Sequence, residues 1–278
     1  MELDDAERIV QELWNLDVAT WNRHWVPTFR KFSHELILGA KLKPGQIILD
    51  VGTGTGIAAL EAAKRVGNGF VIGIDRSSKM IDAARENNKL RNAFFIQMHG
   101  GHMLFSDRLF ARALSNSGIS PGTFPQTIRE ISRVLRDDGL FHLNDWHLID
   151  VPPHRTFSEI LRRHRTQHPS RRLSTWRKAL AVLEGVGTHG DSKRAILQSA
   201  GFKSITEITK PFRIVLPSTQ AYLRMRFDRT ALSQELLELT PFGRRRLLRE
   251  LRRGLATYTG NGHFTFKWNV EFTLASKN

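Results

Sequence analysis

Three glycines at alternate positions, Gly52, Gly54 and Gly56, restrict the possible folds of this chain more than any other feature. They follow the apolar run 47–49, which is typical of a buried strand, and precede the alanine-rich segment 57–66, which is typical of a helix. Because glycine lacks a Cβ, its backbone can turn sharply and lie close to a ligand. The pattern predicts a strand that turns into a helix through a ligand-binding loop.

Short apolar runs continue to alternate with helical segments beyond this loop. Such alternation is typical of an α/β fold with a doubly wound, parallel sheet. A turn is expected at residues 137–139, where two aspartates precede a glycine. We expect strands at 47–49, 70–74, 94–98, 109–114, 140–145, 204–208 and 263–274, and helices at 4–41, 57–66, 79–87, 124–135, 154–187, 192–200 and 218–258.

This pattern divides the chain into four segments. The first contains Trp14, Trp21 and Trp25, which either form a roof over an apolar substrate or pack as an ordinary helical core. The segments are an N-terminal helical lid (1–41), the core with the glycine loop (42–150), an inserted helical cap (151–190), and the remainder of the core with basic helices and the final strand (191–278).

The chain has a formal net charge of +15, and its dense arginine clusters all follow the glycine loop. This charge suggests nucleic acid, an anionic membrane or an acidic substrate as a partner. If segment 241–258 is helical, its leucines share one face, and its arginines form either a solvated surface or an anion-binding one. The clusters are Arg162, Arg163 and Arg165; Arg171 and Arg172; and Arg244, Arg245, Arg246, Arg249, Arg252 and Arg253.

The chain contains no cysteine, which excludes disulfides, thiolate metal sites and a nucleophilic cysteine. No stretch approaches the roughly 18 to 20 apolar residues that span a bilayer. The acidic N-terminus also lacks the charge pattern of a signal peptide. We therefore expect a cytoplasmic protein with no membrane span. Its histidines form no compact ligand pattern, so we expect no metal site.

Two aspartates near the glycines indicate a ligand that contains adenosine. Asp75 lies about 20 residues beyond the loop, at the end of the next expected strand, where a carboxylate accepts hydrogen bonds from two ribose hydroxyls. Asp50 precedes Gly52, where it would repel the pyrophosphate of a dinucleotide. S-adenosylmethionine (SAM) carries positive sulfonium and ammonium groups instead, so Asp50 favours SAM as the cofactor.

The segments LDVGTGTG, GIDRSSKM and EISRVLRDDG resemble the motifs of class I SAM-dependent methyltransferases. Within that superfamily the chain is most similar to the small-molecule enzymes of the ubiquinone/menaquinone-biosynthesis type, over residues 42–145. The resemblance implies a Rossmann-like sheet of seven strands, mostly parallel with the last strand antiparallel. It also implies that Gly52, Thr53, Gly54 and Gly56 line the methionine and ribose portions, that Asp50 places the ammonium group, that Asp75 holds the ribose, and that Arg76 or Met80 borders the adenine.

The chain departs from this family after the third expected strand. His99 stands where the family carries an aspartate that accepts from the adenine amino group, and Ala111 replaces another aspartate of the family. A neutral histidine can still accept a hydrogen bond through one ring nitrogen, although it lacks the charge of a carboxylate. We expect His99, Gly100 and Ser115 to complete the cofactor site.

The carboxyl ends of the strands also indicate candidate catalytic residues, because ligands of open α/β sheets bind there. We expect His147 or His102 to act as a general base, with Asp145 orienting it. The alternative is that these histidines have structural or substrate-packing roles. Methyl transfer itself depends largely on holding donor and acceptor close and aligned, so a triad is not required.

Three functions are compatible with the sequence. The first is a SAM-dependent methyltransferase for a small, apolar or aromatic acceptor bound between the core and the helical cap. The second is an RNA or DNA methyltransferase that uses the basic C-terminal helices, although the sequence has no recognisable RNA-binding module. The third is a SAM-binding protein that does not methylate, either a regulator or a cyclase.

Overall fold

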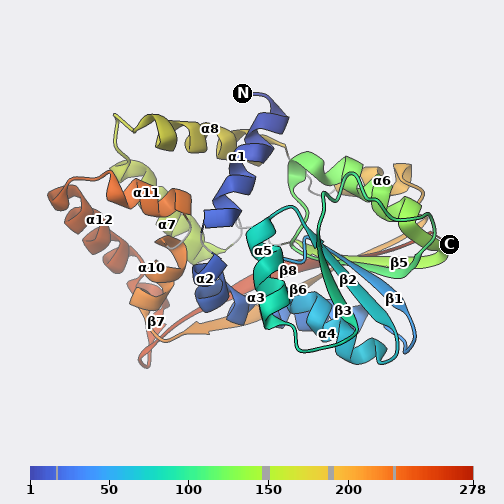
Figure 1. Ribbon diagram of the computed structural model, residues 1–278. Helices are drawn as coiled ribbons and strands as arrows, with labels where there is room; N and C mark the ends of the chain where they lie inside the picture. Colours follow the sequence, from blue (N-terminus) through green and yellow to red (C-terminus); the bar gives the residue numbers. More distant parts are fainter. Residues whose placement is uncertain (17, 146–150, 187–190, 228–229, 278) are drawn as a thin grey trace.

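The computed structural model describes residues 1–16, 18–145, 151–186, 191–227 and 230–277. Its sheet has eight strands in the order β3-β2-β1-β4-β5-β8-β6, with the short β7 paired to β8 (Figure 1). Strands β1 to β5 are parallel, and β8 runs antiparallel to both β5 and β6. The strands are β1 (Ile47–Val51), β2 (Phe70–Asp75), β3 (Ala93–Gln97), β4 (Phe110–Asn116), β5 (Leu135–Asp145), β6 (Ser204–Leu216), β7 (Thr259–Gly260) and β8 (His263–Ser276).

This architecture confirms the α/β, doubly wound, mostly parallel sheet and the antiparallel last strand expected from the sequence. The expected count of seven strands omitted β7, which has two residues and extends the sheet only at one end of β8. A strand of this length gives no detectable alternation of polarity in a sequence.

Helices cover both faces of the sheet. Figure 1 shows α3 and α4 on one face and α6 on the other, where α6 also contacts α9. The helices are α1 (Leu3–Leu16), α2 (Val18–Thr20), the π-helix η1 (Trp21–Trp25), α3 (Val26–Gly39), α4 (Ile57–Val66), α5 (Ser78–Asn87), the 3₁₀ helix η2 (Pro121–Thr123), α6 (Phe124–Val134), α7 (Pro152–His164), α8 (Arg171–Gly185), α9 (Asp191–Ser199), α10 (Thr219–Phe227), α11 (Thr230–Leu237), α12 (Pro241–Gly254) and the 3₁₀ helix η4 (Ala256–Tyr258).

Strand β5 begins earlier than expected. The segment predicted as a turn, 137–139, lies inside β5, where the pairing with β4 shifts its register between Phe110 and Arg112. The short stretch of β4 between these two residues thus lies opposite a longer stretch of β5, as in a β-bulge. The two aspartates and the glycine form an irregularity within one strand instead of a boundary between two elements.

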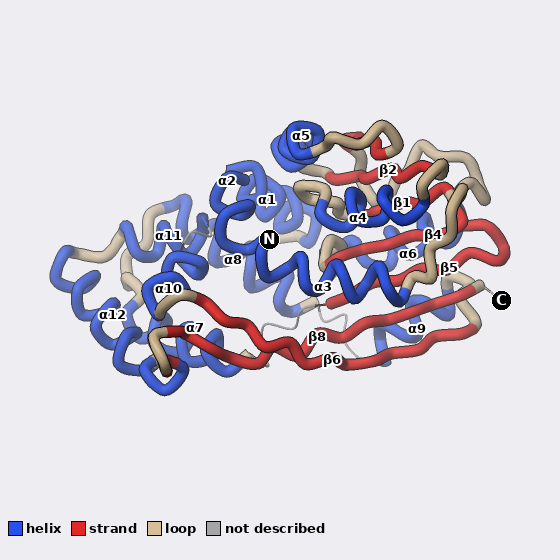
Figure 2. The backbone as a smooth tube through the Cα atoms, turned by 90° about the horizontal axis from the view of Figure 1, so that it is seen from below, coloured by secondary structure: helices blue, strands red, loops and turns tan. Residues whose placement is uncertain are grey.

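Strand β6 is also longer than the expected 204–208, and with β8 it forms a ribbon that extends beyond the sheet. Figure 2 shows the two strands running side by side from the sheet to the helices around α10. The outer half of the ribbon carries Phe264 and Trp268, which are fully buried beneath those helices. Tyr222 of α10 stacks on Phe264 with ring centroids 4.5 Å apart. The ribbon therefore connects the sheet to a helical lobe.

The helical lobe consists of α7, α8, α10, α11 and α12 and lies to one side of the sheet (Figure 1). Helix α12 buries Leu247 and Leu251, and Leu255 just after it is also buried, while most of its arginines are exposed. This confirms the predicted separation of leucines and arginines onto opposite faces. The division of the chain at residues 41, 150 and 190 stays a prediction. Within the described residues, no helix is long and apolar enough to cross a membrane.

Candidate functional site

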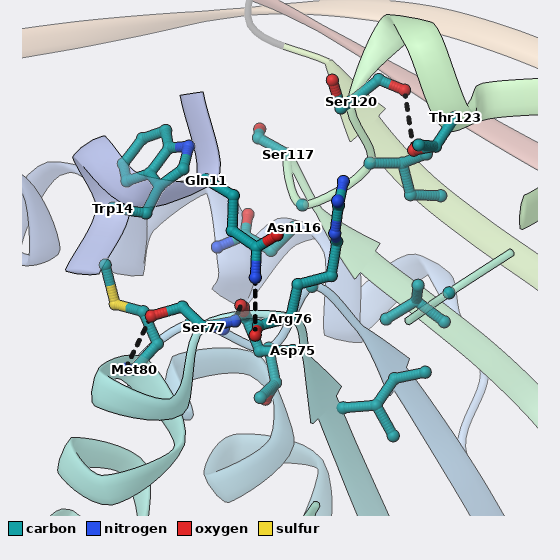
Figure 3. Close-up of a pocket in the computed structure, with 18 of the residues that line it drawn as sticks. Gln11, Trp14, Asp75, Arg76, Ser77, Met80, Asn116, Ser117, Ser120 and Thr123 are labelled. Carbon is teal, nitrogen blue, oxygen red and sulfur yellow. Dashed lines mark hydrogen bonds between the residues drawn. The ribbon is translucent and has the colours of Figure 1, made fainter. Parts of the chain in front are cut away.

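A cavity of about 310 Å³ lies at the carboxyl ends of β1, β2 and β4, beneath α1 (Figure 3). This is the edge of an open α/β sheet at which ligands bind. Its walls combine the glycine loop, the ends of β2 and β4, and aromatic side chains of the N-terminal helices. Its lining includes Glu7, Gln11, Trp14, Trp21, Phe29, Gly52, Thr53, Gly54, Asp75, Arg76, Ser77, Met80, Gly100, Asn116, Ser117, Gly118, Ser120 and Leu183.

The glycine loop leaves β1 and enters α4 with all three glycines in the left-handed region, at φ of 68°, 54° and 87° for Gly52, Gly54 and Gly56. Residues with a Cβ rarely adopt this conformation. A Cβ on Gly54 would meet no atom within 4 Å. Because Gly54 also lines the cavity, its bare backbone leaves room for a ligand there.

Asp75 ends β2 and holds the loop in place through both of its carboxylate oxygens. Oδ2 accepts a 2.9 Å hydrogen bond from the backbone N–H of Gly54, and Oδ1 accepts one of the same length from Ser77. Burial raises the pKa of Asp75 above its ordinary value, and these two N–H groups offset only part of that increase. Each carboxylate oxygen can accept a further hydrogen bond, so the carboxylate suits a pair of ligand hydroxyls.

Asp50 lies beneath the loop, outside the cavity lining. Its Oδ2 accepts hydrogen bonds from the Thr53 hydroxyl, at 2.7 Å, and from the Ala59 N–H, at 3.1 Å. Burial raises its pKa to about 7. Its Oδ1 has no hydrogen-bond partner within the described part of the chain. In this structure Asp50 supports the loop and the first turn of α4, and direct contact with an ammonium group stays a prediction.

Helix α1 closes the cavity through residues that the sequence did not reveal. Gln11 donates a 3.0 Å hydrogen bond to the carbonyl of Arg76, as Figure 3 shows. Glu7 accepts from the guanidinium of Arg76 at 3.2 Å and from the hydroxyl of Ser120. Only the high amphipathic character of the segment could have indicated that one face of α1 meets the core. Its polar contacts come from long-range packing.

The loop after β4 forms the opposite wall. The Ser117 hydroxyl donates to Oδ1 of Asn144 at 2.7 Å, and the Asn144 amide donates to Oδ1 of Asn116 at 2.8 Å. Asn116 and Ser117 therefore present polar groups to the cavity in fixed positions. Ser115, expected in the cofactor site, is buried behind them, and its hydroxyl donates to the carbonyl of Val51 at 2.9 Å.

Much of the segment that surrounds this cavity is similar to a known domain family. Residues 48–139, which contain the glycine loop, Asp75 and the loop after β4, match a methyltransferase domain family. The chain contains a class I SAM-dependent methyltransferase domain. The SAM cofactor and the family resemblance expected from the sequence are confirmed at this level.

Individual proteins similar to this methyltransferase domain are related only distantly. The arsenite methyltransferase of Halobacterium salinarum is 34% identical over 38% of this chain and 28% of its own. The demethylmenaquinone methyltransferase of Corynebacterium kroppenstedtii is 28% identical over 59% of this chain and 70% of its own. The solved YcgJ protein of Bacillus subtilis has the same fold, with a TM-score of 0.54 and 18% identity over 88% of this chain and 98% of its own. The chain spans about a quarter to a half of the length of the first curated relatives that it matches.

The methyltransferase domain places several expected cofactor residues on the cavity wall. Gly52, Thr53, Gly54, Asp75, Arg76, Met80 and Gly100 all line it. Gly56 and His99 lie outside the lining: a Cβ on Gly56 would meet the Phe95 ring at 3.0 Å, while the His99 ring accepts from the Gly101 N–H at 2.9 Å. Burial and nearby Arg76 lower the pKa of His99, which favours the neutral ring. The contact of each residue with the cofactor stays a prediction.

The three candidate catalytic residues are not gathered in the described part of the cavity. His147 lies outside the described residues. His102 is exposed on the loop after β3, and its ring lies 5.4 Å from that of His99. Asp145 ends β5 with its Oδ2 3.8 Å from the Nζ of Lys193, a buried lysine that also contacts Glu271 and Glu207. Within the described residues, no group of histidine, aspartate and glutamate side chains is placed to hold a metal ion.

Proposed function

We propose that this chain binds SAM in the cavity beneath α1 and transfers its methyl group to a small, apolar or aromatic acceptor. The observation that carries the proposal is Asp75, whose carboxylate is fixed by Gly54 and Ser77 at the edge of a cavity walled by aromatic rings. The match of residues 48–139 to a methyltransferase domain supports the same conclusion.

Two features of the cavity suit SAM: the open space beside the Gly54 backbone and the Asp75 carboxylate. The bare backbone at Gly54 leaves space that a Cβ would occupy, and the Asp75 carboxylate accepts hydrogen bonds from hydroxyls. When bound, SAM supplies an electrophilic methyl group on a positively charged sulfur.

The N-terminal helices favour an apolar or aromatic acceptor. Trp14 and Trp21 meet edge to face with ring centroids 5.4 Å apart, and Phe29 lies 5.0 Å from Trp21. All three rings line the cavity. Rings in such arrangements bind flat apolar molecules, and a few polar groups fix their orientation. Asn116 and Ser117 supply those polar groups, and the demethylmenaquinone methyltransferase similarity agrees with a ring-containing acceptor.

The side chains around the cavity contribute mainly by positioning. Methyl transfer is an in-line displacement, so an acceptor held close and aligned reacts faster without a covalent intermediate on the protein. The aromatic wall and α1 exclude water from the acceptor. If the acceptor reacts through a hydroxyl, a base must remove its proton. We assign this role to His147, oriented by Asp145. His147→Gln would then lower turnover without changing SAM affinity.

Calorimetric titration with SAM and S-adenosylhomocysteine tests the proposal. Asp75→Ala removes the acceptor of ribose hydroxyls and of the Gly54 N–H, so we expect affinity to fall at least 100-fold, as for loss of about 3 kcal/mol. Asp82→Ala is the matched control, because Asp82 is an exposed aspartate on α5. Failure of the folded wild-type protein to bind either ligand would contradict the proposal.

Product analysis separates methyl transfer from the two alternatives. With a panel of quinones, phenols and other flat acceptors, S-adenosylhomocysteine should accumulate in proportion to methylated product. Methylation of RNA or DNA alone would favour the nucleic-acid methyltransferase. Tight SAM binding with no S-adenosylhomocysteine formed from any acceptor would favour the regulator or cyclase. The cytoplasmic location stays a prediction from the sequence.

A further inference from the structure

The outer face of α12 is a cationic surface that the proposed catalytic function does not use. Thr240 caps the N-terminus of the helix, and its hydroxyl accepts a 3.1 Å hydrogen bond from the Gly243 N–H. Phe242, Arg246, Arg249 and Arg253 follow at spacings of three or four residues, so they share one face of the helix. Leu247 and Leu251 are buried on the opposite face. Figure 1 shows that α12 lies at the edge of the helical lobe, away from the sheet.

The arginines of this face form no ion pairs within the described part of the protein. Helix α12 contains six arginines and one acid, Glu250. Glu250 is paired with α7 behind the helix, at 2.7 Å from Arg163 and 2.6 Å from His164. Arg245, Arg246, Arg249 and Arg253 are exposed, and no carboxylate of the described residues lies within ion-pair distance of them. The face therefore requires an anionic partner if its charge is to be paired.

Two apolar side chains stand at the end of this cationic face. Leu237, the last residue of α11, is 60% exposed, and Phe242, in the first turn of α12, is 69% exposed. The turn between them is fixed, because Arg244 donates hydrogen bonds to the carbonyls of Leu236 and Leu237. The protein thus holds two large apolar groups in water beside a row of arginines.

We propose that the outer face of α12, together with the α11–α12 turn, binds the surface of an anionic lipid bilayer. Arginines bind headgroup phosphates, while Phe242 and Leu237 enter the boundary of the acyl chains. This combination favours a membrane over nucleic acid, because phosphate binding alone leaves exposed aliphatic leucine without a partner. The surface is separate from the cavity, so the proposal does not depend on the proposed catalytic function. Binding through this surface would place the protein at the bilayer, in which apolar molecules dissolve.

Vesicle co-sedimentation of the full chain tests the surface. The vesicles contain phosphatidylcholine alone or with 30% phosphatidylglycerol, an amount chosen as roughly the charge density of an anionic leaflet. The test variant combines Arg246→Gln, Arg249→Gln and Arg253→Gln. The control combines Lys89→Gln, Arg91→Gln and Arg136→Gln, which removes the same charge from exposed positions on the sheet side. A third variant, Phe242→Ser, keeps the charge, and thermal unfolding by circular dichroism confirms that each variant is folded.

We expect binding to the anionic vesicles only, a loss of about 100-fold in the arginine variant and of about tenfold in Phe242→Ser, and no comparable change in the control. Equal losses in the arginine variant and the control would show that net charge alone drives binding and would overturn the proposal. Absence of vesicle binding, combined with arginine-dependent binding of a single-stranded RNA, would also overturn it and assign the surface to nucleic acid.

Discussion

The backbones of Gly52 and Gly118 are in direct contact, so the loop after β1 and the loop after β4 share one wall of the cavity. A Cβ on either residue would collide with backbone atoms of the other. Gly118 also donates a 3.3 Å hydrogen bond from its N–H to the Ser115 hydroxyl. Two loops that are distant in the sequence therefore keep their positions only while both residues are glycine.

We expect Gly118→Ala to weaken SAM binding at least tenfold, because the added methyl group forces the two loops apart where both line the cavity. Gly185→Ala is the control, since a Cβ at that position meets nothing within 4 Å. Calorimetric titration of both variants measures the effect. Equal SAM affinity in the two variants would show that the loops separate without harm to the site.

The contacts of Glu7 predict that α1 opens more often when this residue is lost. Glu7→Ala removes the acceptor for both the Arg76 guanidinium and the Ser120 hydroxyl. We expect hydrogen exchange in α1 to accelerate about tenfold, as for a loss of about 1.4 kcal/mol. Glu12→Ala, at an exposed position of the same helix, should leave exchange unchanged. If both variants exchange at the wild-type rate, α1 is held by its apolar contacts alone.

Asp50 predicts a dependence of stability on pH in the ligand-free protein. Burial raises its folded pKa from 3.8 to about 7, so between these values the folded state binds the extra proton. Stability relative to Asp50→Asn should therefore fall by about 3 kcal/mol as the pH rises from 4 to 7. Urea unfolding of both proteins across this range measures the difference. Parallel stability curves would show that the folded carboxyl keeps its ordinary pKa.

His142 predicts that stability rises with pH, opposite to the effect of Asp50. Its buried ring donates from Nδ1 to the Leu36 carbonyl at 2.8 Å, and burial lowers its pKa to about 4. The unfolded state then binds the extra proton between pH 4 and 6.5, so stability relative to His142→Asn should rise by about 3 kcal/mol across that window. His168→Asn, at an exposed position, is the control. Urea midpoints that follow the control at every pH would contradict the assignment.

The local parts of the fold and site were predictable because the residues that make them are close in sequence. Gly52 to Gly56 and Asp75 occupy one strand–loop–helix–strand unit, and the structure places this unit as expected. Strand β6 was predicted too short because Lys210 and Pro211 interrupt its apolar pattern. Pro211 is tolerated there because β6 lies at the edge of the sheet, where a missing N–H leaves no neighbouring strand unpaired.

The polar contacts of α1 could not be predicted, because they depend on where a whole helix packs. Glu7 and Gln11 belong to no motif, and each reaches its partner across more than sixty residues of sequence. The catalytic assignment of Asp145 had the same weakness: its position at a strand end was predictable, whereas its contact with Lys193 on α9 was not.

Strand β8 fills the gap between β5 and β6, and it comes after both of them in the chain. Until β8 is in place, β6 has no neighbour in the described sheet, and Tyr222 lacks the Phe264 ring on which it stacks. A newly made chain must therefore hold β6, a strand of thirteen residues, without its neighbour until β8 emerges from the ribosome. Completion of the sheet and packing of the helical lobe on the ribbon thus both wait for the synthesis of β8, and until then β6 is exposed to aggregation and to chaperones.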